Sequence, residues 1–201
     1  MAVLPFETAL RSFDDGWNRA RWEQLPHHDG NRYEVIDGVL YMSTSPSLFH
    51  QWIVLSIVYL LKTQLQDRGM GYVFTGPVGV FMPGCDPVQP DILVVTRDDA
   101  AILHDAHVNG IPALIIEVLS PSHPELDMRI KRAAYALAGL PEYWIVRPAT
   151  RDVLVCSQPN ASLGDFGQTQ LVPADGELSS PTLPFNAQVA DFFAGAPDTT
   201  L

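Results

Sequence analysis

Residues 112–119 form a short, almost entirely apolar run, Pro-Ala-Leu-Ile-Ile-Glu-Val-Leu, with a single charge at Glu117. An apolar run of this length is typical of a buried β-strand. A second buried-strand pattern starts at Asp91, and segments with a helical spacing of apolar residues lie before and after the two strands, at 50–66 and 122–138. This alternation of strands and helices predicts an α/β fold with a mixed sheet.

Turn and cap residues mark where further elements begin and end. Asp37-Gly38 between two β-prone runs is a strong hairpin signal. Ser45-Pro46-Ser47 fits the start of the first long helix, with a serine as its N-cap, and Ser122 with Glu125 fits a capping box for the second. The remaining expectations are a helix or two followed by a loop in residues 1–30, strands at 72–74, 78–82, 142–146 and 152–156, a loop at 83–90, and a strand with a short closing helix at 187–193.

The chain has 201 residues, of which 47% are apolar and 17% are charged. This is enough apolar material for a buried core, so a disordered chain is excluded and a single domain over residues 1–201 is expected. No apolar run approaches the roughly 18 residues that a membrane-spanning helix needs. The N-terminus lacks a basic stretch that leads into an apolar one, and Cys85 and Cys156 are too few for a disulfide scaffold. These features predict a cytoplasmic protein that does not bind membranes.

The charge balance constrains any partner that carries phosphate groups. The chain has 12 basic and 23 acidic residues, and its formal net charge is −11. Proteins that bind duplex nucleic acid by neutralising phosphates normally present a basic face. If this chain binds nucleic acid, a bound cation or a local basic cluster must therefore supply the attraction.

Asp91 and Glu117 are the two candidate metal-binding residues. An ionised carboxylate inside an apolar strand is costly to bury unless a cation pairs with it or it binds a metal. Neighbouring strands would bring both carboxylates to one edge of a sheet, where such oxygen ligands suit Mg²⁺ or Mn²⁺. In the alternative interpretation, Asp91 only caps a turn and Glu117 pairs with an arginine.

The helix expected after Glu117 carries a lysine that could reach this site. Asp127, Lys131 and Tyr135 follow one another at helical spacing and share one face. Helical side chains lean toward the N-terminus, so Lys131 is expected to point back toward the end of the Glu117 strand. There it would hold a nucleophilic water or neutralise charge on a phosphate. In the alternative interpretation, Lys131 forms a surface ion pair with Asp127, worth about 0.5 kcal/mol or less.

Six short motifs follow one another along the chain. They are Tyr33-Glu-Val-Ile-Asp-Gly38, Ser45-Pro-Ser with His50, Pro90-Asp91-Ile, Ile116-Glu-Val-Leu-Ser-Pro121, Asp127 with Lys131, Tyr135 and Gly139, and Glu142-Tyr-Trp-Ile-Val146. With these motifs the chain resembles the Uma2 family of restriction-endonuclease-like proteins (DUF820), within the PD-(D/E)XK nuclease superfamily. The resemblance covers about residues 30–156 and, more loosely, the C-terminal segment.

The resemblance implies a restriction-endonuclease-like fold, in which a central mixed β-sheet is flanked by helices and preceded by an N-terminal helical and hairpin segment. It also implies that Asp91 and Glu117 match the acidic pair of the superfamily and bind Mg²⁺ or Mn²⁺, with help from the carbonyl of Val118. The superfamily motif has a lysine two residues after the second acid, where this chain has Leu119. Lys131 is the matching position in family members whose lysine comes from the next helix.

Three further candidates for catalytic roles lie within these motifs. Glu34, in a strand of the hairpin, is expected to be an outer metal ligand or merely a paired charge. His50, at the start of a helix, is expected to contact substrate, carry a proton or fill a core position. Tyr135 is expected to orient Lys131 or to pack, rather than to react.

The activity implied by the resemblance is that of a metal-dependent endonuclease that hydrolyses phosphodiester bonds in DNA. In this hypothesis Mg²⁺ polarises the phosphate and activates a water, which Lys131 orients. An enzyme that cuts both strands would be a two-fold homodimer. Two alternatives stay open: a binding or scaffold module that keeps the fold without turnover, and an enzyme of this fold that acts on another phosphate ester.

Overall fold

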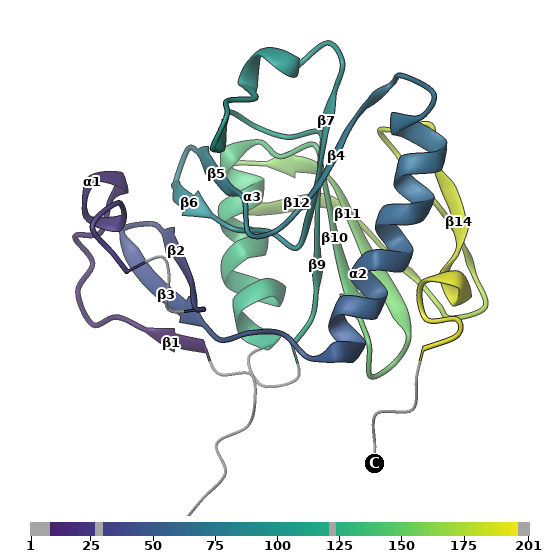
Figure 1. Cartoon of the computed structure of the whole chain (residues 1–201), viewed down its shortest axis with the longest axis horizontal. Helices are drawn as coiled ribbons and strands as arrows, with labels where there is room; N and C mark the ends of the chain where they lie inside the picture. The colour runs from purple at the N-terminus through teal and green to yellow at the C-terminus, as the bar shows by residue number, and fades with distance from the viewer. Residues whose placement is uncertain (1–8, 27–29, 121–123, 197–201) are drawn as a thin grey trace, which may run out of the picture.

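A mixed β-sheet forms the centre of the molecule (Figure 1). The computed structural model describes residues 9–26, 30–120 and 124–196. The six strands of this central sheet lie in the order β12-β11-β10-β9-β7-β4. In chain order they are β4 (Gly71–Thr75), β7 (Ile92–Thr96), β9 (Leu114–Val118), β10 (Glu142–Arg147), β11 (Asp152–Asn160) and β12 (Asp165–Val172). Strands β9 and β10 are parallel and the other neighbours are antiparallel, so the predicted mixed sheet is confirmed.

Helical segments cover both faces of the central sheet (Figure 1). Helix α2 (Leu48–Leu61) continues as the π-helical turn η1 (Lys62–Gln66) and packs on one face. The π-helical turn η3 (Leu126–Lys131) continues as α3 (Arg132–Ala138), which connects the parallel strands β9 and β10 and packs on the other face. Of the two serines in the predicted start of the first long helix, Ser47 caps α2 with its side chain, and Gly139 ends α3 with a left-handed φ of 86°.

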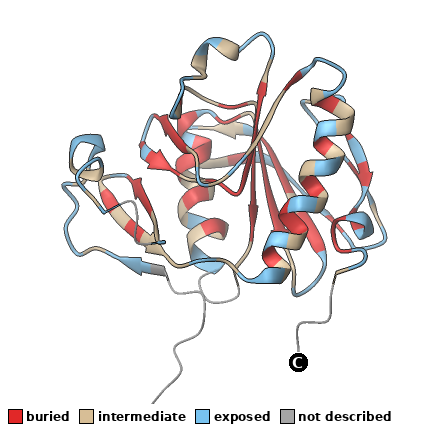
Figure 2. Cartoon of the chain, in the orientation of Figure 1, coloured by how far each residue is buried: buried red, intermediate tan, exposed pale blue. Residues whose placement is uncertain are grey.

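The strands of the central sheet alternate their side chains between the two faces. In β7, Ile92 and Val94 pack toward α2, whereas Leu93 and Val95 pack toward α3. All four side chains are almost completely buried, as the red central strands of Figure 2 show. Full burial of one such side chain stabilises the fold by roughly 1.5–3 kcal/mol. The apolar runs seen in the sequence are therefore strands that are covered on both faces.

A second six-stranded sheet packs beside α3, and the sequence pattern does not predict it as a unit. Its strands, in spatial order, are β1 (Ala9–Arg11), β3 (Val39–Ser43), β2 (Arg32–Ile36), β6 (Cys85–Val88), β5 (Gly79–Met82) and β8 (His107–Asn109). The predicted hairpin joins β2 to β3, and both of its turn residues, Asp37 and Gly38, have positive φ, at 49° and 76°. This is the turn geometry that an Asp-Gly pair favours.

Other expectations were met in part. The predicted loop at 83–90 is wrong, because it contains strand β6. The described part of the first thirty residues has the short helix α1 (Arg19–Trp22) and also strand β1, which pairs with β3. The capping box at Ser122 lies partly outside the described residues.

The C-terminal segment packs beside α2 (Figure 1). It forms β13 (Glu177–Ser179), β14 (Asn186–Gln188) and the 3₁₀ turn η4 (Val189–Phe192), so the expected strand and closing helical turn are present. A further 3₁₀ turn, η2 (Ala100–Ile102), precedes β8. No helix in the described part of the chain is long and apolar enough to span a bilayer.

Candidate active site

Asp91 and Glu117 face each other across two neighbouring strands. Ile92 of β7 pairs with Ile116 of β9 in antiparallel register, so the next opposed positions are those of the two acids. The backbone N–H of Asp91 donates to Glu117 Oε2 at 3.2 Å, and the backbone N–H of Val118 donates to Asp91 Oδ2 at 2.9 Å. Each carboxylate therefore accepts a hydrogen bond from the strand that carries the other.

The alternation of β9 explains which face Glu117 occupies. Ile116 and Val118 point toward α2, whereas Ile115 points toward α3. Glu117 shares the face of Ile115 and meets two side chains from the helical segment η3–α3. Lys131 Nζ lies 2.9 Å from Glu117 Oε1, and the Tyr135 hydroxyl donates to the same oxygen at 3.2 Å. The sequence prediction that Lys131 points back to the Glu117 strand agrees with this geometry.

Three carboxylates surround the ammonium group of Lys131. Glu117 Oε1 lies at 2.9 Å, Glu34 Oε2 at 3.0 Å and Asp127 Oδ1 at 3.5 Å. The alternative of a surface ion pair with Asp127 is wrong in its location, because Lys131 is only 4% exposed and Asp127 is buried too. A buried ammonium with three carboxylates in reach is held far more rigidly than an exposed ion pair.

Asp91 is held by a second set of cationic and polar groups. Arg32 Nη1 donates to Asp91 Oδ1 at 2.6 Å, and His50 Nε2 lies 2.9 Å from Asp91 Oδ2. An ionised carboxylate only accepts hydrogen bonds, so His50 must carry its proton on Nε2. His50 Nδ1 is buried and has no hydrogen-bond partner within the described residues. Asp91 is thus an ion-paired carboxylate, not merely the cap of a turn.

The pKa values of these groups reflect burial and the neighbouring charges. Burial raises the pKa of Glu117 well above its usual range; Lys131 opposes this, and the negative charges of Asp91, Asp127 and Glu34 add to it. Burial also acts to raise the pKa of Asp91, but the hydrogen bond and charge of His50 and the charge of Arg32 lower it overall. Burial acts to lower the pKa of Lys131, but the surrounding carboxylates raise it well above its usual value. Lys131 is therefore a cation at neutral pH and cannot serve as a base.

The cluster contains more carboxyl groups than permanently charged cationic side chains. Four carboxylates (Glu34, Asp91, Glu117 and Asp127) lie against two permanent cations, Arg32 and Lys131. Within the described residues no three His, Cys, Asp or Glu side chains are grouped so that they alone could hold a metal ion. Mg²⁺ seldom requires such a cage, because it usually takes one or two carboxylates and completes its shell with waters and substrate phosphates. The oxygen donors of Asp91 and Glu117 fit such an ion.

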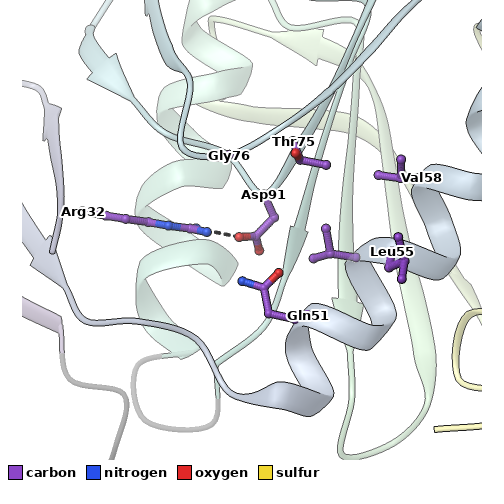
Figure 3. Close-up of a pocket in the computed structure, with 8 residues that line it drawn as sticks. Arg32, Gln51, Leu55, Val58, Thr75, Gly76 and Asp91 are labelled. Carbon is purple, nitrogen blue, oxygen red and sulfur yellow. Dashed lines mark hydrogen bonds and ion pairs between the residues drawn. The ribbon is translucent and has the colours of Figure 1, made fainter. Parts of the chain in front are cut away.

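A cavity of about 190 Å³ opens beside Asp91 (Figure 3). In Figure 3, Arg32 enters from the left and donates to Asp91, while Gln51 of α2 points toward the same carboxylate from below. The wall is partly polar and partly apolar, and it is formed by Arg32, Gln51, Val54, Leu55, Val58, Thr75, Gly76 and Asp91. A small anionic group that entered this cavity would therefore meet the guanidinium of Arg32 next to the acidic pair.

Two residues of this site, Arg32 and Gln51, are not among the residues that the sequence pattern indicates, and the pattern indicates Asp127 only as a helical neighbour of Lys131. Arg32 lies two positions before Glu34, on the same strand β2. Residues two apart on a strand share a face, so the candidate Glu34 carried a signal for Arg32. Gln51 follows the candidate His50 directly, but nothing in its own surroundings in the sequence pointed to a cavity.

Comparisons with known proteins agree with this fold. The model of the Uma2 family, described as "putative restriction endonuclease", matches residues 20–191. The chain is also similar to a protein of known crystal structure from Anabaena variabilis ATCC 29413, described as a "putative nuclease belonging to DUF820". The identity is 17%, the match covers 88% of this chain and 97% of the other, and the TM-score is 0.73, so this likeness concerns the fold. No protein among those with curated descriptions matches the chain.

Proposed function

The chain belongs to the Uma2 family, and from that premise we propose that it is a metal-dependent endonuclease that hydrolyses phosphodiester bonds in DNA. The observation that carries the proposal is the opposed pair of Asp91 and Glu117, with Lys131 at 2.9 Å from Glu117. Two carboxylates can hold a divalent cation that polarises a phosphate, and a nearby ammonium can offset the charge that develops on it.

Asp91 and Glu117 would hold Mg²⁺ or Mn²⁺, together with the carbonyl of Val118. When bound, such an ion polarises the phosphate and lowers the pKa of an attacking water. The surplus of carboxylates in the cluster supports this assignment, because a divalent cation would balance it. It also offers a solution to the net charge of −11, since the cation would supply attraction that the protein surface as a whole lacks.

The surrounding side chains would position these groups. His50 donates to Asp91 and fixes the orientation of its carboxylate. Tyr135 donates to Glu117, and Glu34 holds Lys131 next to it. Protonated Lys131 would donate a hydrogen bond to the attacking water or offset the charge that develops on the phosphate.

The competing hypothesis is a binding or scaffold module without turnover. Its supporting observations are Leu119, which occupies the usual position of the superfamily lysine, and the engagement of Lys131 by three carboxylates. Action on a different phosphate ester is a further alternative, because a fold does not fix a substrate. If the enzyme cuts both DNA strands, we expect a two-fold homodimer.

Calorimetric titration with Mn²⁺ and plasmid nicking separate these hypotheses. The wild type is expected to bind Mn²⁺ and to nick DNA only when the metal is present, and Asp91→Asn and Glu117→Gln are each expected to lose both properties. Asp152→Asn is the matched control, because Asp152 is also buried and paired with an arginine, Arg147. Mn²⁺ binding without nicking would favour another phosphate ester, and a wild type that binds no Mn²⁺ would favour the scaffold.

A further inference from the structure

Arg32 forms the outer ion pair of the site and also lines the cavity beside it. Its Nη1 atom donates to Asp91 Oδ1 at 2.6 Å, and its side chain is 20% exposed (Figure 3). Lys131, the other cation of the cluster, is 5% exposed in its side chain and lies within 3.5 Å of three carboxylates. Arg32 pairs with Asp91 alone among the described carboxylates. Arg32 is therefore the cation that can leave the cluster with the smaller loss of contacts.

Arg32 and a divalent cation would compete for the same carboxylate. Two cations in contact with one carboxylate repel each other, and the repulsion is strong where the carboxylate is removed from water. Asp91 is only 4% exposed. A guanidinium group does not lose its proton in a protein, so the competition can be relieved only if the Arg32 side chain moves.

The cavity supplies a new partner for a displaced guanidinium. It extends along Arg32 and Asp91 to Gln51, Thr75 and Gly76, so an anion inside it lies within the reach of Arg32. A guanidinium presents donors in a planar fork that matches two phosphate oxygens. A phosphodiester brought to the acidic pair would thus offer Arg32 the hydrogen bonds that it gives up at Asp91.

We propose that Arg32 exchanges partners during substrate binding: it pairs with Asp91 until a divalent cation binds there, and it then binds the substrate phosphate in the adjacent cavity. This inference rests on the proposed nuclease function. It makes Arg32 both a competitor of the metal and an anchor of the substrate. Removal of the Arg32 charge should therefore have two opposite effects: the metal binds more tightly, and the reaction becomes slower.

The chain contains a second arginine–aspartate pair whose arginine matches Arg32 in exposure, with a more exposed aspartate, 45% against 4%. Arg132 donates to Asp165 Oδ1 at 2.6 Å, and its side chain is also 20% exposed. Arg132 lies on α3 and pairs with β12, so it contributes nothing to the cavity beside Asp91. Arg132→Gln is therefore the control for the general effect of breaking a half-buried arginine–aspartate pair.

The first measurement is calorimetric titration of Mn²⁺ into the whole protein. Arg32→Gln is expected to bind Mn²⁺ about tenfold more tightly than the wild type, since the competing charge is gone. Arg132→Gln is expected to bind as the wild type does. Equal or weaker Mn²⁺ binding by Arg32→Gln would overturn the inference while leaving the proposed function intact, and a wild type that binds no Mn²⁺ would overturn both.

The second measurement is plasmid nicking at saturating Mn²⁺, where a difference in metal affinity has no influence. Arg32→Gln is expected to nick about 100-fold more slowly, the usual order for loss of one charged donor at a reacting phosphate. Nicking at the wild-type rate would overturn the inference. If Arg32→Gln does not fold, Arg32→Lys serves instead: it keeps the charge but loses the fork, so it should bind Mn²⁺ within about threefold of the wild type and still nick more slowly.

Discussion

Lys131 Nζ lies 2.9 Å from Glu117 Oε1, and this buried contact joins the helical segment η3–α3 to the end of strand β9. Both partners are less than 5% exposed. Without the helical segment, Glu117 would be a buried charge without its cation, and without the strand, Lys131 would be a buried charge without this carboxylate. Their encounter therefore ties the candidate site to correct packing of α3 on the sheet.

Replacement of Lys131 by methionine should destabilise the protein by about 3–5 kcal/mol, because it leaves three buried carboxylates without their shared cation. Methionine keeps much of the volume, so the loss reports charge more than packing. Urea unfolding of wild type and variant measures the effect. Lys62→Met, at an exposed position of η1, is the control and should stay within about 0.5 kcal/mol of the wild type. A similar, small effect for both variants would contradict the role assigned to Lys131.

Removal of the Tyr135 hydroxyl should weaken the orientation of Glu117 without removing any charge. Tyr135→Phe loses a buried hydrogen bond to Glu117 Oε1, and we expect a cost of about 1–2 kcal/mol in the free energy of unfolding. If Glu117 binds Mn²⁺, calorimetry should also show a several-fold weaker affinity. Tyr143→Phe is the control: its hydroxyl donates to the backbone carbonyl of Asp127, so its loss should affect stability but not Mn²⁺ affinity. Equal Mn²⁺ affinities of Tyr135→Phe and wild type would count against a positioning role.

The central strands and the acidic pair could be predicted because their signals are local. The short apolar runs at β7 and β9 are typical of strands buried on both faces. The charge that precedes the first run, Asp91, and the charge inside the second, Glu117, each need a partner when buried. The direction of Lys131 followed from helix geometry alone. These features depend on periodicity over a few residues, which the sequence displays directly.

The second sheet and the Arg32 contact could not be predicted, because they depend on pairings between distant segments. Strand β6 lies in a stretch rich in proline and glycine that reads as a loop, and it becomes a strand only between β2 and β5. Arg32 and Asp91 are 59 positions apart, and neither residue carries a local sign of the other. Long-range contacts of this kind override local propensity.

The turn between β2 and β3 offers a test of the hairpin that carries Arg32 and Glu34. Gly38 has a φ of 76°, and a Cβ atom there would lie 2.3 Å from the backbone oxygen of Asp15. Gly38→Ala should therefore destabilise the protein by about 2 kcal/mol or more, through both strain and steric overlap. Gly30 has a similar φ of 80°, and a Cβ atom there would have no neighbour within 4 Å among the described residues, so Gly30→Ala should show only the cost of strain. Thermal unfolding of both variants measures the difference, and equal losses would contradict the close approach of Asp15.

Asp127 should make the stability of the protein depend on pH in the acidic range between its unfolded pKa of 3.8 and its folded pKa of about 6. Burial raises its pKa from 3.8 to about 6, against the opposing charge of Lys131. A carboxyl whose pKa is higher in the folded than in the unfolded state stabilises the fold below its unfolded pKa, and this contribution is lost as the pH rises through about 6. The change from Asp127 to asparagine removes this dependence.

At each pH, the quantity of interest is the free energy of unfolding of Asp127→Asn minus that of the wild type. This difference should be about 1–3 kcal/mol more favourable to the variant at pH 8 than at pH 4. Urea unfolding of both proteins at the two pH values gives this difference directly, and comparison within each pH cancels the titration of all other groups that the change leaves alone. Asp175→Asn, at an exposed position, is the control and should show no such difference. The opposite result, a difference that becomes less favourable to the variant as the pH rises from 4 to 8, would contradict the prediction. It would mean that the ion pair of Asp127 with Lys131 outweighs the cost of burying the charge of Asp127.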